Sequence, residues 1–302
     1  MKPVPVISMF AGKGGVGKTS CAAATALHHV ARGKKTLAIS TDAAPSLSHI
    51  FELTGGAAAL PESLSIRELG EPEIKEMWDG KFGREVYEVF SSFVSVRYED
   101  FVEFMTSLLP GLGEEFMVDY IRELSRKGAY ESIIWDTAPL GQTLALLRTP
   151  AMLARHLKLA PRIYSRLKVG RQSREPVLDI LRRWEALSEE DMAFLRSRVE
   201  FNLVSIPEAL SVEQLDGVFR ELDQCGFRVK RLIVNNVISE PDSPFLAMRA
   251  RQQRPYLDAM RLKYAALEIV ELPMFPWELK GLERLREAEK ILFGGDGKPA
   301  PV

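Results

Sequence analysis

The chain has little cysteine and no long apolar run. Its 302 residues include only Cys21 and Cys225, which lie far apart and form no CxxC pair. This scarcity argues against a disulfide framework and against a cysteine-rich zinc site within one chain. No apolar stretch approaches the roughly 18 to 20 residues of a membrane-spanning helix, and residues 1–10 lack the features of a signal peptide. We therefore expect a cytoplasmic protein in which both cysteines are core residues.

An excess of charge of either sign is also missing. Forty basic residues stand against 41 acidic ones, for a formal net charge of −1. The overall electrostatics therefore give no reason to expect nucleic-acid binding. The composition, 46% hydrophobic and 27% charged, is that of a globular protein. The length allows one domain with insertions, or two.

Short apolar runs rich in β-branched residues alternate with longer helical patterns. Six of these runs are strong, and they cover residues 4–10, 35–40, 131–136, 199–206, 229–236 and 267–272, while a weaker one covers 64–69. The alternation predicts an α/β fold, with a doubly wound, mostly parallel sheet covered by helices on both faces. An alanine-rich helix is expected from Thr19 to Arg32, with Gly33 as its stop signal.

The glycine-rich stretch between the first strand and this helix is typical of a phosphate-binding loop. Residues 12–19 satisfy the pattern G-x-x-x-x-G-K-[ST], with a strand before it and a helix after it. Successive backbone N–H groups of such a loop point at phosphate oxygens. Lys18 should then reach the β and γ phosphates of ATP, and the Thr19 hydroxyl should ligate Mg²⁺. The predicted ATP-binding residues of the loop are Gly12, Gly14, Gly15, Val16, Gly17, Lys18, Thr19 and Ser20.

Two aspartates lie where strands of this sheet should end. Asp42 follows the run at 35–40, and Asp136 ends the run at 131–136. Ligands of open α/β sheets bind outside the carboxyl ends of the strands, so both carboxylates can face the phosphates. Asp136 is then the candidate to hold Mg²⁺, and Asp42 to orient or deprotonate the attacking water. Either residue could instead be a helix N-cap, although two such acids in one P-loop domain favour function.

Two helical stretches interrupt the alternation of strands and helices. The first, about 71–127, has large apolar residues from Trp78 to Leu109, often at helical spacing. The second, about 150–198, contains a basic run that is either a solvated face or a contact for anionic lipid or an acidic receptor. We interpret both as insertions that form a helical subdomain on one face of a single P-loop ATPase domain spanning 1–302. The basic run consists of Arg155, Lys158, Arg162, Arg166, Lys168, Arg171 and Arg174.

Several motifs together resemble those of one ATPase family. The stretches GKGGVGKTS, STDAAPSLSHIF and WDTAPLGQTLALL, followed by IPEALS, IVNN and LPMFPWELKG, extend from about Val6 to Gly281. Their order and spacing are similar to those of the family that contains the arsenical pump-driving ATPases and the ATPases that target tail-anchored membrane proteins. The loop alone indicates only the deviant Walker A class, which the MinD and ParA partitioning ATPases share.

The resemblance implies roles for both lysines of the loop. In this class the first lysine, here Lys13, reaches the nucleotide of the other subunit across a two-fold interface, while Lys18 serves its own. A homodimer is therefore implied, with Asp42 as the catalytic acid and switch segments at 41–51 and 136–147. Other residues that match nucleotide-contacting positions are Glu208, Asn235, Pro273, Met274, Phe275 and Pro276. Asn235 would recognise the adenine edge and the last four would cover the base, although Glu208 could instead cap its helix and Asn235 end its strand.

The sequence departs from the family pattern at three places. The usual Asp-Pro-Ala-His of the first switch is Asp-Ala-Ala-Pro at 42–45, and the usual Gly-His-Thr of the second is Gly-Gln-Thr at 141–143. Ser243 and Leu246 stand where the targeting ATPases carry a CxxC that shares zinc between subunits. Neither can supply a thiolate, so we expect a dimer without zinc.

Two kinds of function fit these motifs. The first is an ATP-hydrolysing dimeric switch of the tail-anchored protein targeting type, whose aromatic helices form a groove for a hydrophobic client segment. In the second, these aromatics are ordinary core, and the chain is the ATPase subunit of an arsenite or anion efflux system, or a MinD/ParA-like dimer with another partner. ATP and Mg²⁺ are the expected cofactors. A membrane receptor or permease is a candidate partner, which would bring the protein to the membrane periphery.

Overall fold

The chain divides into two compact units. The computed structural model describes residues 5–42, 46–53, 59–91, 97–102, 112–137, 141 and 174–294. Unit 1 comprises 1–69, 127–143 and 198–302, and unit 2 comprises 70–126 and 144–197. The chain therefore passes between the two units four times.

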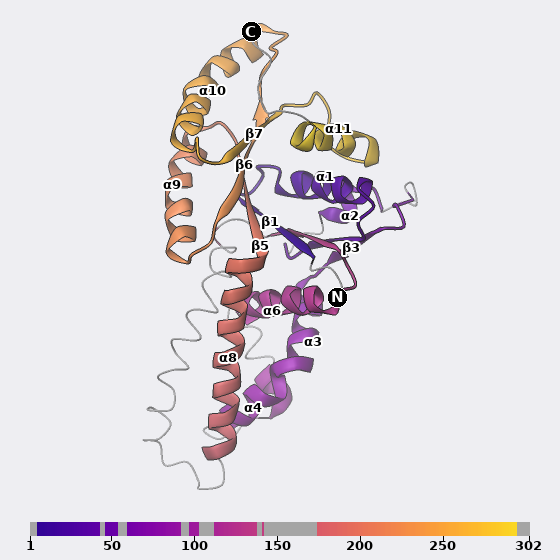
Figure 1. The fold of residues 1–302 in the computed structure, drawn as a ribbon, viewed down its shortest axis with the longest axis vertical. Coiled ribbons are helices and arrows are strands. Elements are labelled where there is room, and N and C mark those ends of the chain that lie inside the picture. The colour runs from indigo at the N-terminus through magenta and orange to yellow at the C-terminus, as the bar shows by residue number, and fades with distance from the viewer. Residues whose placement is uncertain are drawn as a thin grey trace. The chain divides into compact units, whose positions relative to one another are not determined.

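Unit 1 is built on a seven-stranded parallel sheet (Figure 1). Its strands are β1 (Val6–Gly12), β2 (Thr36–Ser40), β3 (Leu64–Glu68), β4 (Ser132–Asp136), β5 (Val199–Ser205), β6 (Val229–Val237) and β7 (Glu268–Pro273). Their order across the sheet is β3-β2-β4-β1-β5-β6-β7, and every neighbouring pair is parallel. The predicted α/β fold is thus confirmed, and the weak run at 64–69 is an edge strand.

Helices cover both faces of this sheet (Figure 1). One face carries α1 (Lys18–Ala31), α2 (Leu47–Ile50) and α11 (Leu282–Phe293), and the other carries α9 (Ala209–Gln224) and α10 (Pro244–Lys263). The alanines of α1 are small enough for the helix to lie close against both the strands and α11, and most of them are fully buried. Gly33, in the left-handed region with φ of 74°, ends α1 as the sequence predicts.

The two cysteines differ in their surroundings. Cys21 lies in α1 and is fully buried, as predicted. Cys225 lies at the carboxyl end of α9 and is only partly buried, so the prediction that it is a core residue is wrong. The reason is its position, because a residue at the end of a sheet-flanking helix has only part of its surface against the strands.

The described part of unit 2 is helical. It contains α3 (Glu71–Trp78), the π-helical turn η1 (Asp79–Gly83), α4 (Arg84–Ser91), α6 (Leu112–Lys127) and α8 (Arg174–Arg198). Trp78, Phe101 and Phe116 are buried, and the Tyr87 ring lies edge-on to Phe101 at 5.3 Å. These aromatics are therefore core residues of the unit. The side chain of Phe90, residues 103–111 and residues 142–173, with most of the basic run, lie outside the described residues. Of the helices that the structure describes, none is both long and apolar enough to cross a membrane.

A buried ion cluster joins α6 to α8 within unit 2. The Arg122 side chain is 3% exposed, and its Nη2 lies 2.6 Å from Asp119 and its Nε 2.7 Å from Asp191. Both carboxylates are buried, and Lys81 of η1 also pairs with Asp119. Burying charges is costly unless each has a partner, so the guanidinium holds the two helices together by pairing with both acids, and Lys81 supplies the second positive charge.

Removing this guanidinium should strongly destabilise unit 2. We expect Arg122→Ala to lower the free energy of unfolding by about 3 to 5 kcal/mol, because Asp191 and Asp119 lose their buried cation and only Asp119 also pairs with Lys81. Urea titration followed by circular dichroism measures the loss. The matched control is Arg182→Ala, an arginine that is 72% exposed and pairs with Asp179 on the surface of α8. Its expected effect is below about 1 kcal/mol, and equal stability of the two variants would contradict the prediction.

Candidate active site

The phosphate-binding loop joins β1 to α1 in unit 1. Gly12 has no room for a side chain, because an ideal Cβ would lie 2.3 Å from the Val204 carbonyl oxygen. Gly15 and Gly17 have φ of 78° and 95°, in the left-handed region that favours glycine. Gly14 lies in open space at the tip of the loop. The loop thus leads into the amino end of α1, where backbone N–H groups without intrahelical partners can bind phosphate oxygens.

Asp136 meets Thr19 at the end of the central strands. Its Oδ2 accepts hydrogen bonds from the Thr19 hydroxyl at 2.8 Å and the Ser40 hydroxyl at 3.3 Å. The sheet register explains this meeting, since both Phe10 of β1 and Ser40 of β2 lie opposite Asp136. The two residues predicted to hold Mg²⁺ are therefore neighbours, although 117 positions separate them in the sequence.

Burial shifts the acid and the lysine of this site in opposite directions. It raises the pKa of Asp136 to about 6, against the Thr19 hydrogen bond and the Lys18 charge, which favour the carboxylate. Burial also lowers the pKa of Lys18, and the carboxylates of Asp136 and Asp42 oppose that shift. Each charge is thus less stable here than in water, and bound ions of opposite charge would compensate for the loss of solvation.

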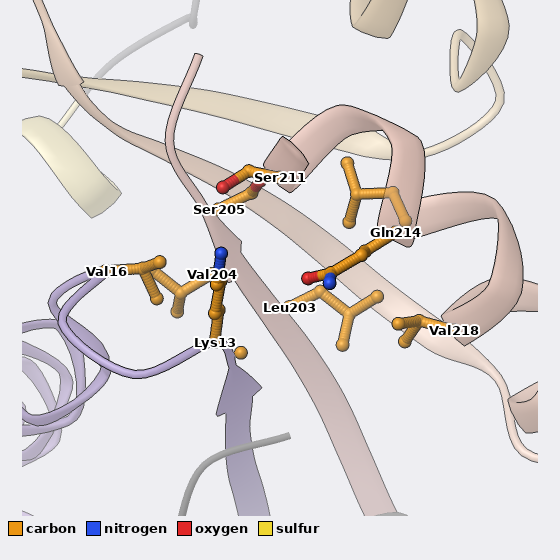
Figure 2. Close-up of a pocket in the computed structure, with 10 residues that line it drawn as sticks. Lys13, Val16, Leu203, Val204, Ser205, Ser211, Gln214 and Val218 are labelled. Carbon is orange, nitrogen blue, oxygen red and sulfur yellow. The ribbon is translucent and has the colours of Figure 1, made fainter. Parts of the chain in front are cut away.

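The two loop lysines point to different places. Lys18 is buried in the first turn of α1, and its Nζ donates a hydrogen bond to the Lys13 carbonyl oxygen at 3.2 Å. Lys13 is half-buried and lines a small pocket between the loop and α9. Figure 2 shows its amine directed toward Ser205, at the end of β5, and Ser211, in the first turn of α9. Within one chain Lys13 therefore lies against its own α9.

Asn235 supports the loop from β6. Its side chain is buried, and its Nδ2 donates a hydrogen bond to the Val16 carbonyl oxygen at 2.9 Å. A Cβ added to Gly17 would lie 2.3 Å from this Nδ2, which is a second reason for glycine at that position. The Asn235 Oδ1 is buried and accepts no hydrogen bond from the described residues. A free amide oxygen can accept from the amino group of adenine, so the geometry is compatible with the predicted role.

The other residues predicted to contact the base lie at the surface. Glu208 is exposed at the N-cap position of α9, but its side chain makes no capping hydrogen bond and instead contacts Arg249 at 3.3 Å. Residues 273–276 follow β7, where the Met274 amide donates to the Val237 carbonyl oxygen at 2.9 Å. The Met274 side chain is exposed there.

Two polar residues that the sequence analysis did not select position the first switch. Besides binding Asp136, the Ser40 hydroxyl accepts a hydrogen bond from the Asp42 amide at 3.3 Å. Glu68, at the end of β3, accepts hydrogen bonds from the amides of Leu47 at 2.8 Å and Ser48 at 3.1 Å, and so caps α2. A signal for Ser40 was present, because it is the last residue of a strand that leads into Asp42. Nothing local marks Glu68. Residues 43–45, 138–140 and 142–147 of the two switches lie outside the described residues.

Ser243 and Leu246 form a helix cap. The Ser243 hydroxyl accepts a hydrogen bond from the Leu246 amide at 3.2 Å at the start of α10. This is the usual contact between an N-cap serine and the third residue of its helix. The spacing that would serve two zinc ligands thus serves a cap in this chain.

The residues of the site fit a magnesium nucleotide. The Asp136 Oδ1 is buried and receives no hydrogen bond from any described residue, so it is free to accept one from a metal-bound water. Thr19 and Asp136 would hold Mg²⁺, and Lys18 with the loop amides would hold the phosphates. When bound, Mg²⁺ would neutralise part of the negative charge of the phosphates.

The sheet, the glycine loop and the Thr19–Asp136 pair define a P-loop nucleotide-binding enzyme. The chain belongs to the anion-transporting ATPase family, whose sequence profile matches residues 6–294. It is 30% identical over 296 residues to the putative arsenical pump-driving ATPase 2 of Aquifex aeolicus, which covers 95% of this chain and 98% of that protein. It is also 31% identical over 323 residues to ATPase GET3B of Arabidopsis thaliana, covering 94% and 78% of the two chains. The predicted family is confirmed, and the chain is an ATP-hydrolysing enzyme.

Proposed function

We propose that the chain is a homodimeric, ATP-driven switch that binds hydrophobic segments of membrane proteins and delivers them to a membrane. The proposal rests on how the chain is divided between the two units just after Asp136. At Thr143, seven residues beyond this carboxylate, the chain leaves unit 1 for the helical unit 2. A change of Mg²⁺ or phosphate contacts at Asp136 therefore acts on a segment covalently linked to the helices proposed to hold a client.

In this proposal the site residues divide the chemistry of hydrolysis. Lys18 and the loop amides stabilise charge on the phosphates of their own nucleotide, and Asp42 orients the attacking water. Lys13 leaves α9 and reaches the nucleotide of the partner subunit when the two subunits close. Asn235 accepts from the adenine edge, with Glu208 and residues 273–276 around the base.

An exposed apolar surface near this site supports a dimer. Phe245 and Met248 lie one turn apart on α10, and Leu210 lies in the first turn of α9. All three are more than half exposed, with Phe245 at 65%. The contact between Arg249 and Glu208 brings these two helix starts together. We propose that this surface packs against a second copy and that no zinc is shared there.

The cysteines favour client delivery over metalloid efflux. Trivalent arsenic is a soft ion that binds clustered thiolates. The chain has only two cysteines, and burial raises the pKa of Cys21 to about 12, which keeps that thiol protonated. Cys225 directly follows α9, which covers the opposite face of the sheet from the α1 helix that contains Cys21 (Figure 1). Efflux stays the second candidate because several relatives are named arsenical pump-driving ATPases.

Capture of a hydrophobic peptide tests the proposal. We expect a crosslinkable peptide of about 20 apolar residues to bind Asp42→Asn protein held in ATP better than the ADP form, because only a state-dependent contact couples client to nucleotide. Serine at Phe90, Phe93 and Met105 should weaken capture while leaving basal hydrolysis nearly intact. Leu262→Ser is the matched control, since this residue of α10 in unit 1 is 84% exposed.

A different result of the serine substitutions is expected if these side chains belong to the hydrophobic core. If Phe90, Phe93 and Met105 were core residues like Phe101, their replacement would destabilise the fold by about 2 to 5 kcal/mol per site and abolish hydrolysis. Thermal melting of the triple variant separates this case from loss of a groove. A wild-type protein that ignores the peptide in every nucleotide state would contradict the proposal and put the efflux function first.

A further inference from the structure

A polar cavity of about 290 Å³ lies where the central strands begin, at the end of the sheet opposite the phosphate-binding loop. It is lined by residues of β1, β5 and β6, by the second half of α1 and the turn that follows it, and by Phe293 at the end of α11. β1 runs from this cavity to Gly12, and α1 returns from Lys18 to it. One strand and one helix thus join the cavity to the nucleotide site, but none of the proposed nucleotide-binding residues lines it.

The cavity carries an excess of positive charge. Four of its lining side chains are cationic and one is anionic, and these are Arg32, Lys34, Lys230 and Arg231 against Glu200. Lys230 pairs with Glu200 at 2.7 Å, and Arg231 pairs with Glu268, outside the lining, at 2.6 Å. Arg32 and Lys34 have no carboxylate within 4.0 Å among the residues that the structure describes. Two positive charges are therefore left without a counterion.

Polar groups without partners accompany these cations. The Nδ1 of His29 and the Nε of Arg231 are buried and make no hydrogen bond with the described residues. Burial first, and then the neighbouring charges of Lys34 and Arg32, lower the pKa of His29 to about 4, so its ring is neutral at pH 7. Ser8 and Asn202 add two buried polar side chains from the strands. Arg32 is exposed and Lys34 partly buried, so both charges are accessible to a ligand, and a bound anion would be attracted by the cations and could accept a hydrogen bond from the unpartnered Arg231 Nε.

We propose that this cavity binds a small organic phosphate. A phosphate dianion matches the two uncompensated charges, and its oxygens can accept from the Arg32 guanidinium and the Lys34 ammonium at once. The volume exceeds that of a phosphate group and is near the lower limit of small-molecule pockets, which leaves room for a small polar body. Ser8 and Asn202 offer that body hydrogen bonds.

Titration with ribose 5-phosphate tests this site. The protein is first saturated with Mg²⁺ and ADP, so that its phosphate-binding loop is filled, and histidine ring protons are followed by NMR. The chain has four histidines, and His28 and His29 line the cavity. We expect their signals to shift saturably while the His49 signal stays in place. Ribose, which lacks the phosphate, should cause no shift.

Charge variants separate specific binding from general attraction. The double variant Arg32→Ala/Lys34→Ala should weaken binding of ribose 5-phosphate about tenfold or more in calorimetry. Lys35→Ala/Arg228→Ala is the matched control, because it removes the same charge from residues outside the lining, and it should change the affinity less than about twofold. Both variants should bind ADP normally, which verifies that they are folded.

Four results would overturn the inference. The first is no shift of the His28 and His29 signals at about 10 mM ribose 5-phosphate, a concentration that detects even weak binding. The second is equal weakening by the control variant. Equally tight binding of gluconate would exclude a phosphate-specific site, and equally tight binding of inorganic phosphate would exclude a role for the organic body.

Discussion

Asp136→Asn should lower magnesium-dependent ATP hydrolysis about 100-fold or more and yet stabilise the nucleotide-free protein at pH 7. The catalytic loss is expected because asparagine keeps the hydrogen bonds of Thr19 and Ser40 but supplies no negative charge to a cation. The gain in stability is expected because the charge that serves the ion is buried, with only 1% of Asp136 exposed. One substitution therefore moves activity and stability in opposite directions.

The sign of the stability effect follows from the pKa of this carboxyl. Burial raises it from 3.8 to about 6, so the folded protein binds this proton more tightly than the unfolded chain does. Stability of the free protein should thus fall as the pH rises from about 4 to about 6, and above pH 6 the loss is complete. Asparagine carries no charge at either pH, so the substitution removes this loss of stability. We expect the free energy of unfolding to rise by about 1 to 3 kcal/mol at pH 7 and to change little at pH 4.

Thermal melting at both pH values, without nucleotide, measures this gain, and phosphate release at saturating Mg²⁺ measures the loss of activity. Asp258→Asn is the matched control, because this aspartate of α10 is exposed and, among the residues that the structure describes, pairs only with Arg261 of the same helix. It should change neither quantity. An Asp136→Asn protein that hydrolyses ATP at the wild-type rate would exclude the proposed role of Asp136.

Lys18→Ala should abolish nucleotide binding or turnover, whereas Lys13→Ala should bind nucleotide and turn it over about 100-fold or more slowly. Lys18 is buried beside Asp136 and Asp42, where its charge acts on the phosphates of its own loop. Lys13 is half-buried and directed toward α9 (Figure 2), so its replacement leaves the phosphate contacts of its own loop intact. Its proposed contact forms only with a second subunit, and ATP-dependent dimerisation should weaken as well.

Fluorescent-nucleotide binding, single-turnover hydrolysis and light scattering with ATP distinguish the two lysines. Lys35→Ala is the control, since this lysine precedes β2 at the opposite edge of the sheet from the loop. It should behave as the wild type in all three measurements. Wild-type turnover by Lys13→Ala would remove the role across the interface, while an unchanged Lys18→Ala would contradict the phosphate site itself.

Much of the ATPase unit could be predicted from local patterns. Apolar runs of strand length were all strands, because a central parallel strand buried on both faces must be apolar throughout, and the weak run at 64–69 is weak because β3 is a partly exposed edge strand. The loop was equally clear, since a positive φ at Gly15 and Gly17 and the close approach of Gly12 to Val204 all require glycine. The glycine pattern and the positive φ values belong to the loop itself, so the sequence predicts the loop, whereas the contact of Gly12 with the distant Val204 is seen only in the structure.

Contacts between distant residues could not be predicted from local patterns. Glu68 caps α2 from another strand, and no local pattern relates a glutamate at a strand end to a helix some 20 positions before it. Ser243 and Leu246 were interpreted from what they cannot bind, and their hydrogen bond appears only in the folded helix start. Cys225 was assigned to the core because its residue type is usually buried, but its place at a helix end leaves it only partly buried.

By itself the sequence determined the fold class, the phosphate-binding loop and the family, because periodicity, glycine spacing and ordered motifs are properties of neighbouring residues. Only the tertiary structure decided which distant groups meet. It placed Asp136 beside Thr19 through strand register, gathered cations from β6 and from the turn after α1 around one cavity, and buried Trp78 and Phe101 as core. Burial and charge at such places depend on groups far apart in the chain, so the raised pKa of Asp136 and the cation-lined cavity arise only in the folded sheet.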